Sequence, residues 1–166
     1  MRRILATSGS LTLTWLRLIL GIVFFAHGAQ KVLGWFGGNG FTATMGFFEG
    51  RGIPAVLAFL AIMAEFAGGI GLIIGFLSRI AAFGILCNMI VAIAMVHARN
   101  GFFMNWTGAQ RGEGFEYHVL AISAAVTIIV QGAGALSVDH ALTSPARPGS
   151  QPSTRPRGVH PGSAAA

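Results

Sequence analysis

Cysteine and charged residues are both scarce in this chain of 166 residues. Cys87 is the only cysteine, which excludes an intrachain disulfide, a CxxC redox pair and a cysteine metal cluster. Charged residues make up only 10% of the chain and hydrophobic residues 54%, whereas a soluble domain carries about 25% charged residues. The net charge of +6 is spread over helix ends and the C-terminal tail rather than a continuous stripe, so we expect no nucleic-acid partner.

Four long apolar runs dominate what is present, at about residues 13–33, 54–77, 80–97 and 116–136. About 20 apolar residues in a helix cross the hydrocarbon core of a bilayer. The sequence therefore predicts an all-α integral membrane protein built as a four-transmembrane-helix bundle. Residues 41–49 predict a short interfacial helix in the first outer loop, where Trp35 and several phenylalanines suit the depth of the headgroups.

These runs divide the chain into three parts. Residues 1–12 form a short N-terminus, residues 13–142 the membrane domain, and residues 143–166 a tail rich in Pro, Arg and Ser that we expect to be disordered. Four spans place both termini on one side, together with most of the arginines. Because positive charge collects on the cytoplasmic side, we expect both termini to be cytoplasmic.

Glu65 is the one carboxylate within the second apolar run. An acidic side chain at that depth costs at least about 2.5 kcal/mol, so it needs a partner or a proton. Ala58, Ala61, Gly68 and Gly69 share its helical face, which indicates that another helix packs closely there. We expect a structural ion pair between Arg17 and Glu65. In the alternative, Arg17 reaches the inner headgroups and Glu65 stays protonated.

Further polar residues gather at the helix ends that the topology places on the outer side: His27, Gln30, Lys31, His97, Arg99, Glu116, Tyr117 and His118. They could hydrogen-bond a quinone carbonyl or relay protons. A haem would need a facing pair such as His27 and His97, and nothing in the spacing selects such a pair, so we do not expect a haem. The alternative is that they only cap helix ends at the interface. No HxxxH or ExxH spacing is present, so we expect no metal site.

Asn88 is the one interior polar residue of the third run. It lies about 180° from His97 around an ideal helix, so we do not expect both side chains to point inward.

Several motifs in this order resemble the DoxX family of small bacterial membrane proteins. They are R-x(9)-H-G-x-x-K at residues 17–31, A-x-x-x-E-x-x-G-G at 61–69, S-R-x-A-A at 78–82, V-H-x-x-x-G-F-F at 96–103 and L-S-V-D at 136–139. The resemblance covers about residues 13–142 and implies a four-helix protein of the bacterial inner membrane. Some relatives are described as quinone-linked subunits of a thiosulfate-oxidising enzyme, and others as membrane partners of thiol or superoxide defence proteins.

Together these features favour a quinone-linked or partner-anchoring component of a redox or oxidative-stress system. The candidate catalytic residues are His27, Lys31, Glu65 and His97, and the candidate quinone contacts are His27, Gln30, Lys31 and His118. Any electron transfer would need a bound quinone or a soluble protein partner, because the chain has no flavin or nicotinamide motif. The alternatives are a non-enzymatic membrane scaffold and a small proton-coupled transporter. Whether the protein forms an oligomer is left open.

Overall fold

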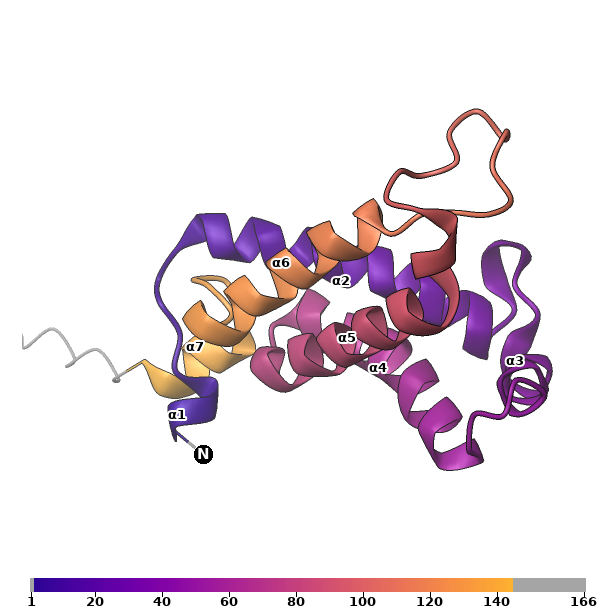
Figure 1. The fold of residues 1–166 in the computed structure, drawn as a ribbon. Coiled ribbons are helices and arrows are strands. Elements are labelled where there is room, and N and C mark those ends of the chain that lie inside the picture. Colours follow the sequence, from indigo (N-terminus) through magenta and orange to yellow (C-terminus); the bar gives the residue numbers. More distant parts are fainter. Residues whose placement is uncertain (1, 145–166) are drawn as a thin grey trace, which may run out of the picture.

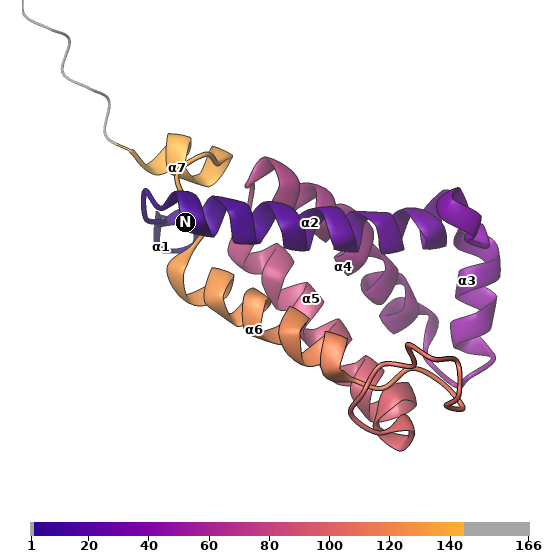
Figure 2. The same cartoon turned by 90° about the horizontal axis from the view of Figure 1, so that it is seen from above.

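The computed structural model describes residues 2–144, and the tail beyond them lies outside the described residues. The described elements are α1 (Arg2–Leu5), α2 (Leu11–Val32), η1 (Trp35–Gly37), α3 (Gly40–Glu49), α4 (Ala55–Ile74), α5 (Ser78–Ala92), η2 (Ile93–His97), η3 (Ala98–Asn100), α6 (Glu116–Gln131) and α7 (Val138–Thr143). Four of them, α2, α4, α5 and α6, run side by side as a bundle (Figures 1 and 2).

Three of the helical stretches are long and apolar enough to cross a membrane: Leu11–Val32, Ala55–Ile74 and Ser78–Asn100. Helix α6 is shorter, with 16 residues and therefore a length of about 24 Å. It ends at Gln131 rather than near Leu136 because Gly132 and Gly134 both have positive φ angles, 90° and 85°, and turn the chain back. The predicted helical character is thus confirmed, and the count of four spans stays a prediction.

Glycines allow α2 and α4 to pack at backbone contact. A Cβ atom at Gly28 would lie 2.4 Å from the Cα atom of Phe66, and one at Gly69 would lie 2.5 Å from the backbone nitrogen of Phe25. Small residues on the Glu65 face therefore meet another helix, as the sequence predicts. Helix α4 also packs on α5 and α5 on α6, whereas α6 touches α2 much less.

Helix α5 continues into a π-helical turn, η2, between Asn88 and His97. A π turn holds one more residue than an α turn, so it rotates the residues after the turn relative to those before it. The amide of Asn88 points to α4, where Nδ2 donates to the carbonyl of Ala61 at 2.8 Å, while the ring of His97 packs on His118 of α6. The expectation that Asn88 and His97 cannot both point inward is therefore wrong, because it assumed an ideal α-helix.

The short helices α1 and α7 lie together at one end of the bundle, beside the turn between α4 and α5 (Figures 1 and 2). Buried Asp139 of α7 clamps this turn: its two carboxylate oxygens accept from the backbone nitrogens of Leu77 and Ser78, each at 2.9 Å. Arg79 of α5 donates to the carbonyls of Ile129, Val130 and Ala6. We call this region the closed end: Thr14, Arg17, Arg79, Asp139 and the helix ends that they contact.

Arg17 belongs to the closed end and does not pair with Glu65, so the predicted ion pair is wrong. Its buried guanidinium donates to the carbonyls of Leu72, Ile73, Ala133 and Leu136. Helix α4 ends at Ile74, and the last carbonyls of a helix have no N–H partner within it. The carbonyls of Leu72 and Ile73 at this helix end therefore hold Arg17 there, away from the middle of α4.

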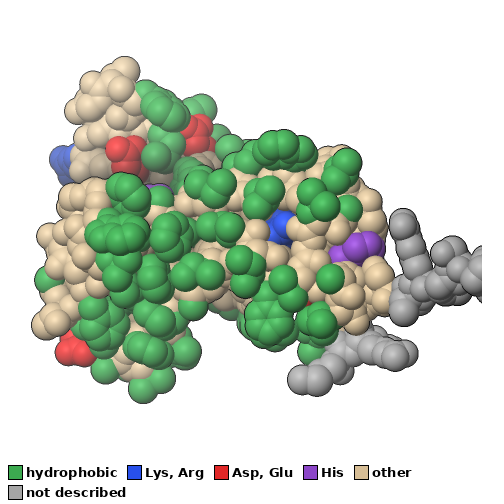
Figure 3. All heavy atoms as spheres, turned by 180° about the vertical axis from the view of Figure 1, so that it is seen from behind, with side chains coloured by type: hydrophobic (Ala, Val, Ile, Leu, Met, Phe, Trp, Pro, Cys, Tyr) green, Lys and Arg blue, Asp and Glu red, His purple; other side chains and the backbone are tan. Residues whose placement is uncertain are grey.

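Apolar side chains cover much of the outer surface of the bundle (Figure 3). The exposed large residues include Trp15, Ile19 and Ile22 of α2, Val56, Phe59 and Leu60 of α4, and Phe83 and Ile90 of α5. A soluble monomer rarely exposes so continuous an apolar surface. Helices covered in this way suit a lipid environment.

Candidate functional site

The opposite end of the bundle carries α3 and the long loop between η3 and α6 (Figure 1). We call it the loop end and define it by the residues His27, Lys31, Glu65, Asn88, His97, Tyr117 and His118. They come from α2, α4, α5, η2 and α6, so all the long helices contribute.

Glu65 pairs with Lys31, the last basic residue of α2. Among the residues that the structure describes, this is the single ion pair. The close contact of Gly28 with Phe66 explains the pairing, because it brings the C-terminal half of α2 against the backbone of Glu65. The carboxylate is buried, and its second oxygen lies 3.4 Å from the amide nitrogen of Asn88. A buried charge is thus compensated by a cation and an amide donor.

His97 and His118 form the centre of the loop end, with ring centroids 4.1 Å apart. Nδ1 of His97 lies 2.8 Å from the carbonyl oxygen of Glu113. Because a carbonyl can only accept, Nδ1 must carry the proton, which leaves Nε2 of neutral His97 as an acceptor. His118 is buried, and its Nδ1 has no hydrogen-bond partner among the described residues.

Tyr117 lies between His118 and His27. Its ring centroid is 5.4 Å from that of His118 and 6.3 Å from that of His27. The Tyr117 hydroxyl is also buried without a hydrogen-bond partner in the described part of the chain, and it lies within electrostatic range of Glu65. His27 is exposed on α2, on the side toward Tyr117. Two buried polar atoms without partners in the described chain therefore lie near an exposed histidine.

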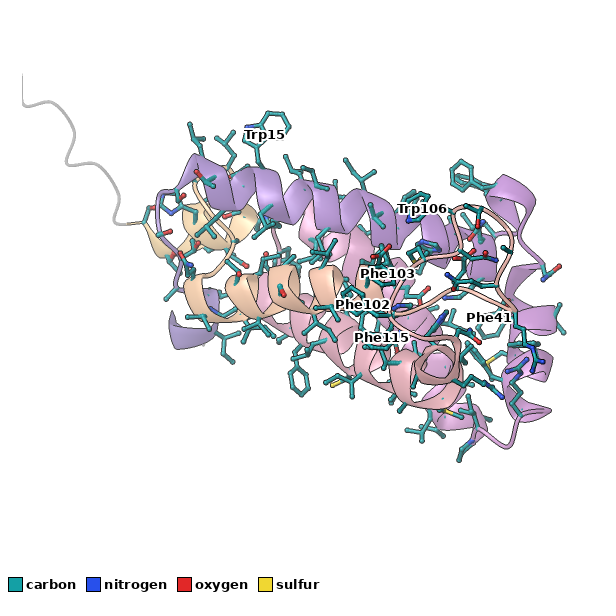
Figure 4. All side chains as sticks on the ribbon, turned by 45° about the horizontal axis from the view of Figure 1, so that its top comes forward. Trp15, Phe41, Phe102, Phe103, Trp106 and Phe115 are labelled. Atoms are coloured by element: carbon teal, nitrogen blue, oxygen red, sulfur yellow. The ribbon has the colours of Figure 1, made fainter. Side chains whose placement is uncertain are left out.

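The loop between η3 and α6 adjoins this cluster through the contact of Glu113 with His97. Its two ends are pinned together, since the nitrogens of Phe115 and Glu116 donate to the carbonyls of Gly101 and Phe102. Glu116 accepts from the indole of Trp106 at 3.2 Å. Figure 4 shows Phe102, Phe103 and Phe115 gathered near the start of α6, with Trp106 in the same loop and Trp15 at the far end of α2.

The structure divides the predicted quinone contacts into two groups. His27 and His118 belong to the cluster around Tyr117, whereas Gln30 and Lys31 line a groove of about 370 Å³ between the end of α2, η1 and α3. Of the predicted catalytic residues, Lys31 and Glu65 form one pair and His97 stacks on His118 elsewhere in the same end. The predicted roles of all these residues stay predictions.

Sequence reasoning placed Tyr117 only among the polar residues of the outer helix ends, without naming it as a catalytic residue or a quinone contact, and it did not expect Asn88 to contact Glu65. Tyr117 is the only tyrosine and stands between two predicted polar residues at the start of an apolar run, which was a usable signal. Asn88 gave no such signal, because its contact with Glu65 depends on the packing of α5 against α4. Within residues 2–144, no group of three or more His, Cys, Asp or Glu side chains is placed to hold a metal ion. Whether a haem binds stays untested.

An apolar helical bundle with a polar cluster inside one end defines the class: a helical integral membrane protein with a candidate internal ligand site. The DoxX family model matches residues 12–98, slightly more than half of the chain. The chain therefore belongs to the DoxX family. The comparisons with curated proteins and with solved structures gave no significant match.

Proposed function

We propose that this protein is a quinone-linked component of the bacterial inner membrane, with both termini in the cytoplasm and the loop end facing outward. The observation that carries the proposal is the pair of buried atoms without partners among the described residues, Tyr117 Oη and His118 Nδ1. A buried polar atom without a partner costs about 1–3 kcal/mol, so it is expected where a ligand supplies the missing bond.

A quinone headgroup fits the chemistry of these residues. Its carbonyl oxygens only accept hydrogen bonds, and Tyr117 offers a hydroxyl donor while His118 offers a ring nitrogen that can carry a proton. His27 faces the bilayer beside Tyr117 and is placed to meet a lipid-soluble molecule entering between α2 and α6. The Lys31–Glu65 pair would hold or exchange protons next to the bound ring.

A titration with decylubiquinone in nanodiscs tests this proposal. We expect saturable quenching of the fluorescence of Trp106, whose indole is bonded to Glu116 next to Tyr117 in sequence. The W15F variant should keep the response, because Trp15 lies at the far end of α2 (Figure 4), and the W106F variant should lose most of it. Quenching that is linear in quinone, or equal in both variants, would contradict binding at the loop end.

A second candidate function is a scaffold that anchors a soluble redox or stress-defence protein. The observation that favours it is the exposed aromatic surface of the loop 101–115, made by Phe102, Phe103 and Trp106, which is 85% exposed. Exposed aromatic residues are enriched in protein interfaces. If F103S with W106S abolished co-purification of a stoichiometric soluble partner, and decylubiquinone caused no saturable quenching of Trp106 in the wild type, the scaffold would replace the quinone site.

A further inference from the structure

The groove at the end of α2 is a second site, which shares Lys31 with the ion pair invoked above and none of the residues around Tyr117. It is lined by Gln30, Lys31, Gly37, Gly38, Asn39, Ala43, Thr44, Phe47 and Phe48. Its volume of about 370 Å³ falls within the range of small-molecule pockets. Two aromatic rings from α3 provide an apolar side, and amide, hydroxyl and ammonium groups provide a polar one.

The charge of the groove is of one sign. Among the described residues, Lys31 is its only charged lining residue, and no carboxylate lines it. The Lys31 side chain is 28% exposed, whereas that of its partner Glu65 is only 8% exposed. Lys31 therefore belongs both to the ion pair with the buried carboxylate of Glu65 and to the lining of the open groove.

The wall of the groove is held in place before any ligand binds. A Cβ atom at Gly38 would lie 2.2 Å from the carbonyl oxygen of Gln30, so the glycine lets the η1 segment lie directly on α2. Gln30 Nε2 donates to the carbonyl of Phe36 at 3.2 Å. Phe36 itself has a φ of 52°, a left-handed conformation that is rare for a residue with a side chain and is found most often at functional sites.

We propose that this groove binds a small carboxylate with an apolar body. The carboxylate of the ligand and the carboxylate of Glu65 both contact the Lys31 ammonium, and Glu65 keeps the amide of Asn88 as a second donor. The apolar body packs on Phe47 and Phe48. Two sources share this chemistry: a water-soluble aromatic acid entering from outside, and the head of a fatty acid from the outer leaflet.

The test measures binding to the full chain in phosphatidylcholine nanodiscs by calorimetry, with benzoate as the soluble probe and palmitate as the lipid probe. Benzyl alcohol is the uncharged control. We expect benzoate or palmitate to bind and benzyl alcohol to bind at least tenfold more weakly. Binding of benzoate alone assigns a water-soluble ligand, and binding of palmitate alone assigns a fatty acid.

Two substitutions on α3 provide a matched pair. Ala43 lines the groove and Thr42 beside it does not, although both side chains are exposed. We expect A43W to weaken carboxylate binding at least tenfold and T42W to leave it unchanged, with equal melting temperatures. Absence of binding in the wild type, or equal binding in A43W and T42W, would overturn the proposal. The decylubiquinone response should persist in A43W, so that failure of one site is distinguishable from failure of the other.

Discussion

The two ends of the bundle differ in how their largest buried polar side chains are partnered. At the closed end, the side chains of Arg17 and Asp139 make four and two hydrogen bonds to backbone atoms of helix ends and turns. At the loop end, the side chains of Tyr117 and His118 make none with any residue that the structure describes. The hydroxyl of Ser78 at the closed end also lacks a partner in the described chain, as does Arg79 Nε, although the other guanidinium nitrogens of Arg79 donate to three carbonyls.

This difference separates a structural role from a binding role. Polar side chains that already have backbone partners gain few hydrogen bonds from a ligand. Removing such a side chain leaves backbone groups at helix ends without partners. Groups without partners lower the stability of the protein while the site is empty and gain a hydrogen bond when a ligand arrives. The closed end is thus expected to carry stability, and the loop end to carry function.

The largest expected effect comes from R17M at the closed end. The substitution removes a buried guanidinium that donates to four carbonyls. We therefore expect the free energy of unfolding to fall by about 3 kcal/mol or more, seen as a lower melting temperature in detergent or as failure of the protein to accumulate. R99M is the matched control, because exposed Arg99 donates only to carbonyls of its own helical turn within the described residues. Equal destabilisation by the two substitutions would show that the hydrogen bonds of Arg17 contribute no more to stability than those of Arg99.

A smaller effect is expected from D139A. It leaves the backbone nitrogens of Leu77 and Ser78 without acceptors at a turn where Leu77 has a φ of 50°. We expect a loss of about 2 kcal/mol, and a smaller loss for D139N, which keeps one acceptor. Thermal unfolding of both variants measures this order. Because both variants remove the carboxylate charge, equal losses would show that the charge of Asp139 matters more than its hydrogen bonds.

The smallest expected effects on stability come from removing one hydroxyl group at each end, that of Thr14 and that of Tyr117. Thr14 Oγ1 donates to the carbonyl of Ser10 and accepts from the nitrogen of Leu136, whereas the Tyr117 hydroxyl has no partner in the described structure. T14V should therefore cost about 1 kcal/mol, and Y117F should leave the melting temperature unchanged or raise it. If Y117F cost as much as T14V, the two ends would not differ in the way described.

The helices were predictable because long apolar runs need only local information, and the Glu65 face was recognisable from its small residues. The partner of Glu65 was not predictable in the same way. Arg17 and Lys31 lie on one stripe of α2, and the sequence does not state which of them stands level with the carboxylate. That depends on the close approach of Gly28 to Phe66 and on the end of α4 at Ile74, which supplies carbonyls for Arg17.

Two other features also depended on packing. The π turn at Ile93–His97 rotates His97 toward α6 and cannot be inferred from an apolar run. The helix α7 is short, and its role rests on Asp139 meeting the turn between α4 and α5, which is distant in sequence. His97 and Asp139 both lie in motifs that resemble the DoxX family, but the motifs do not show what each side chain contacts.

The most direct test of the difference between the two ends is the shift in melting temperature that decylubiquinone causes in nanodiscs, measured for the wild type, T14V and Y117F. We expect the quinone to raise the melting temperature of the wild type and of T14V by the same amount, because the Thr14 site takes no part in binding. In Y117F the shift should fall by at least half, while the protein without quinone melts no lower than the wild type. An equal shift in all three proteins would contradict the assignment of the loop end as the binding site.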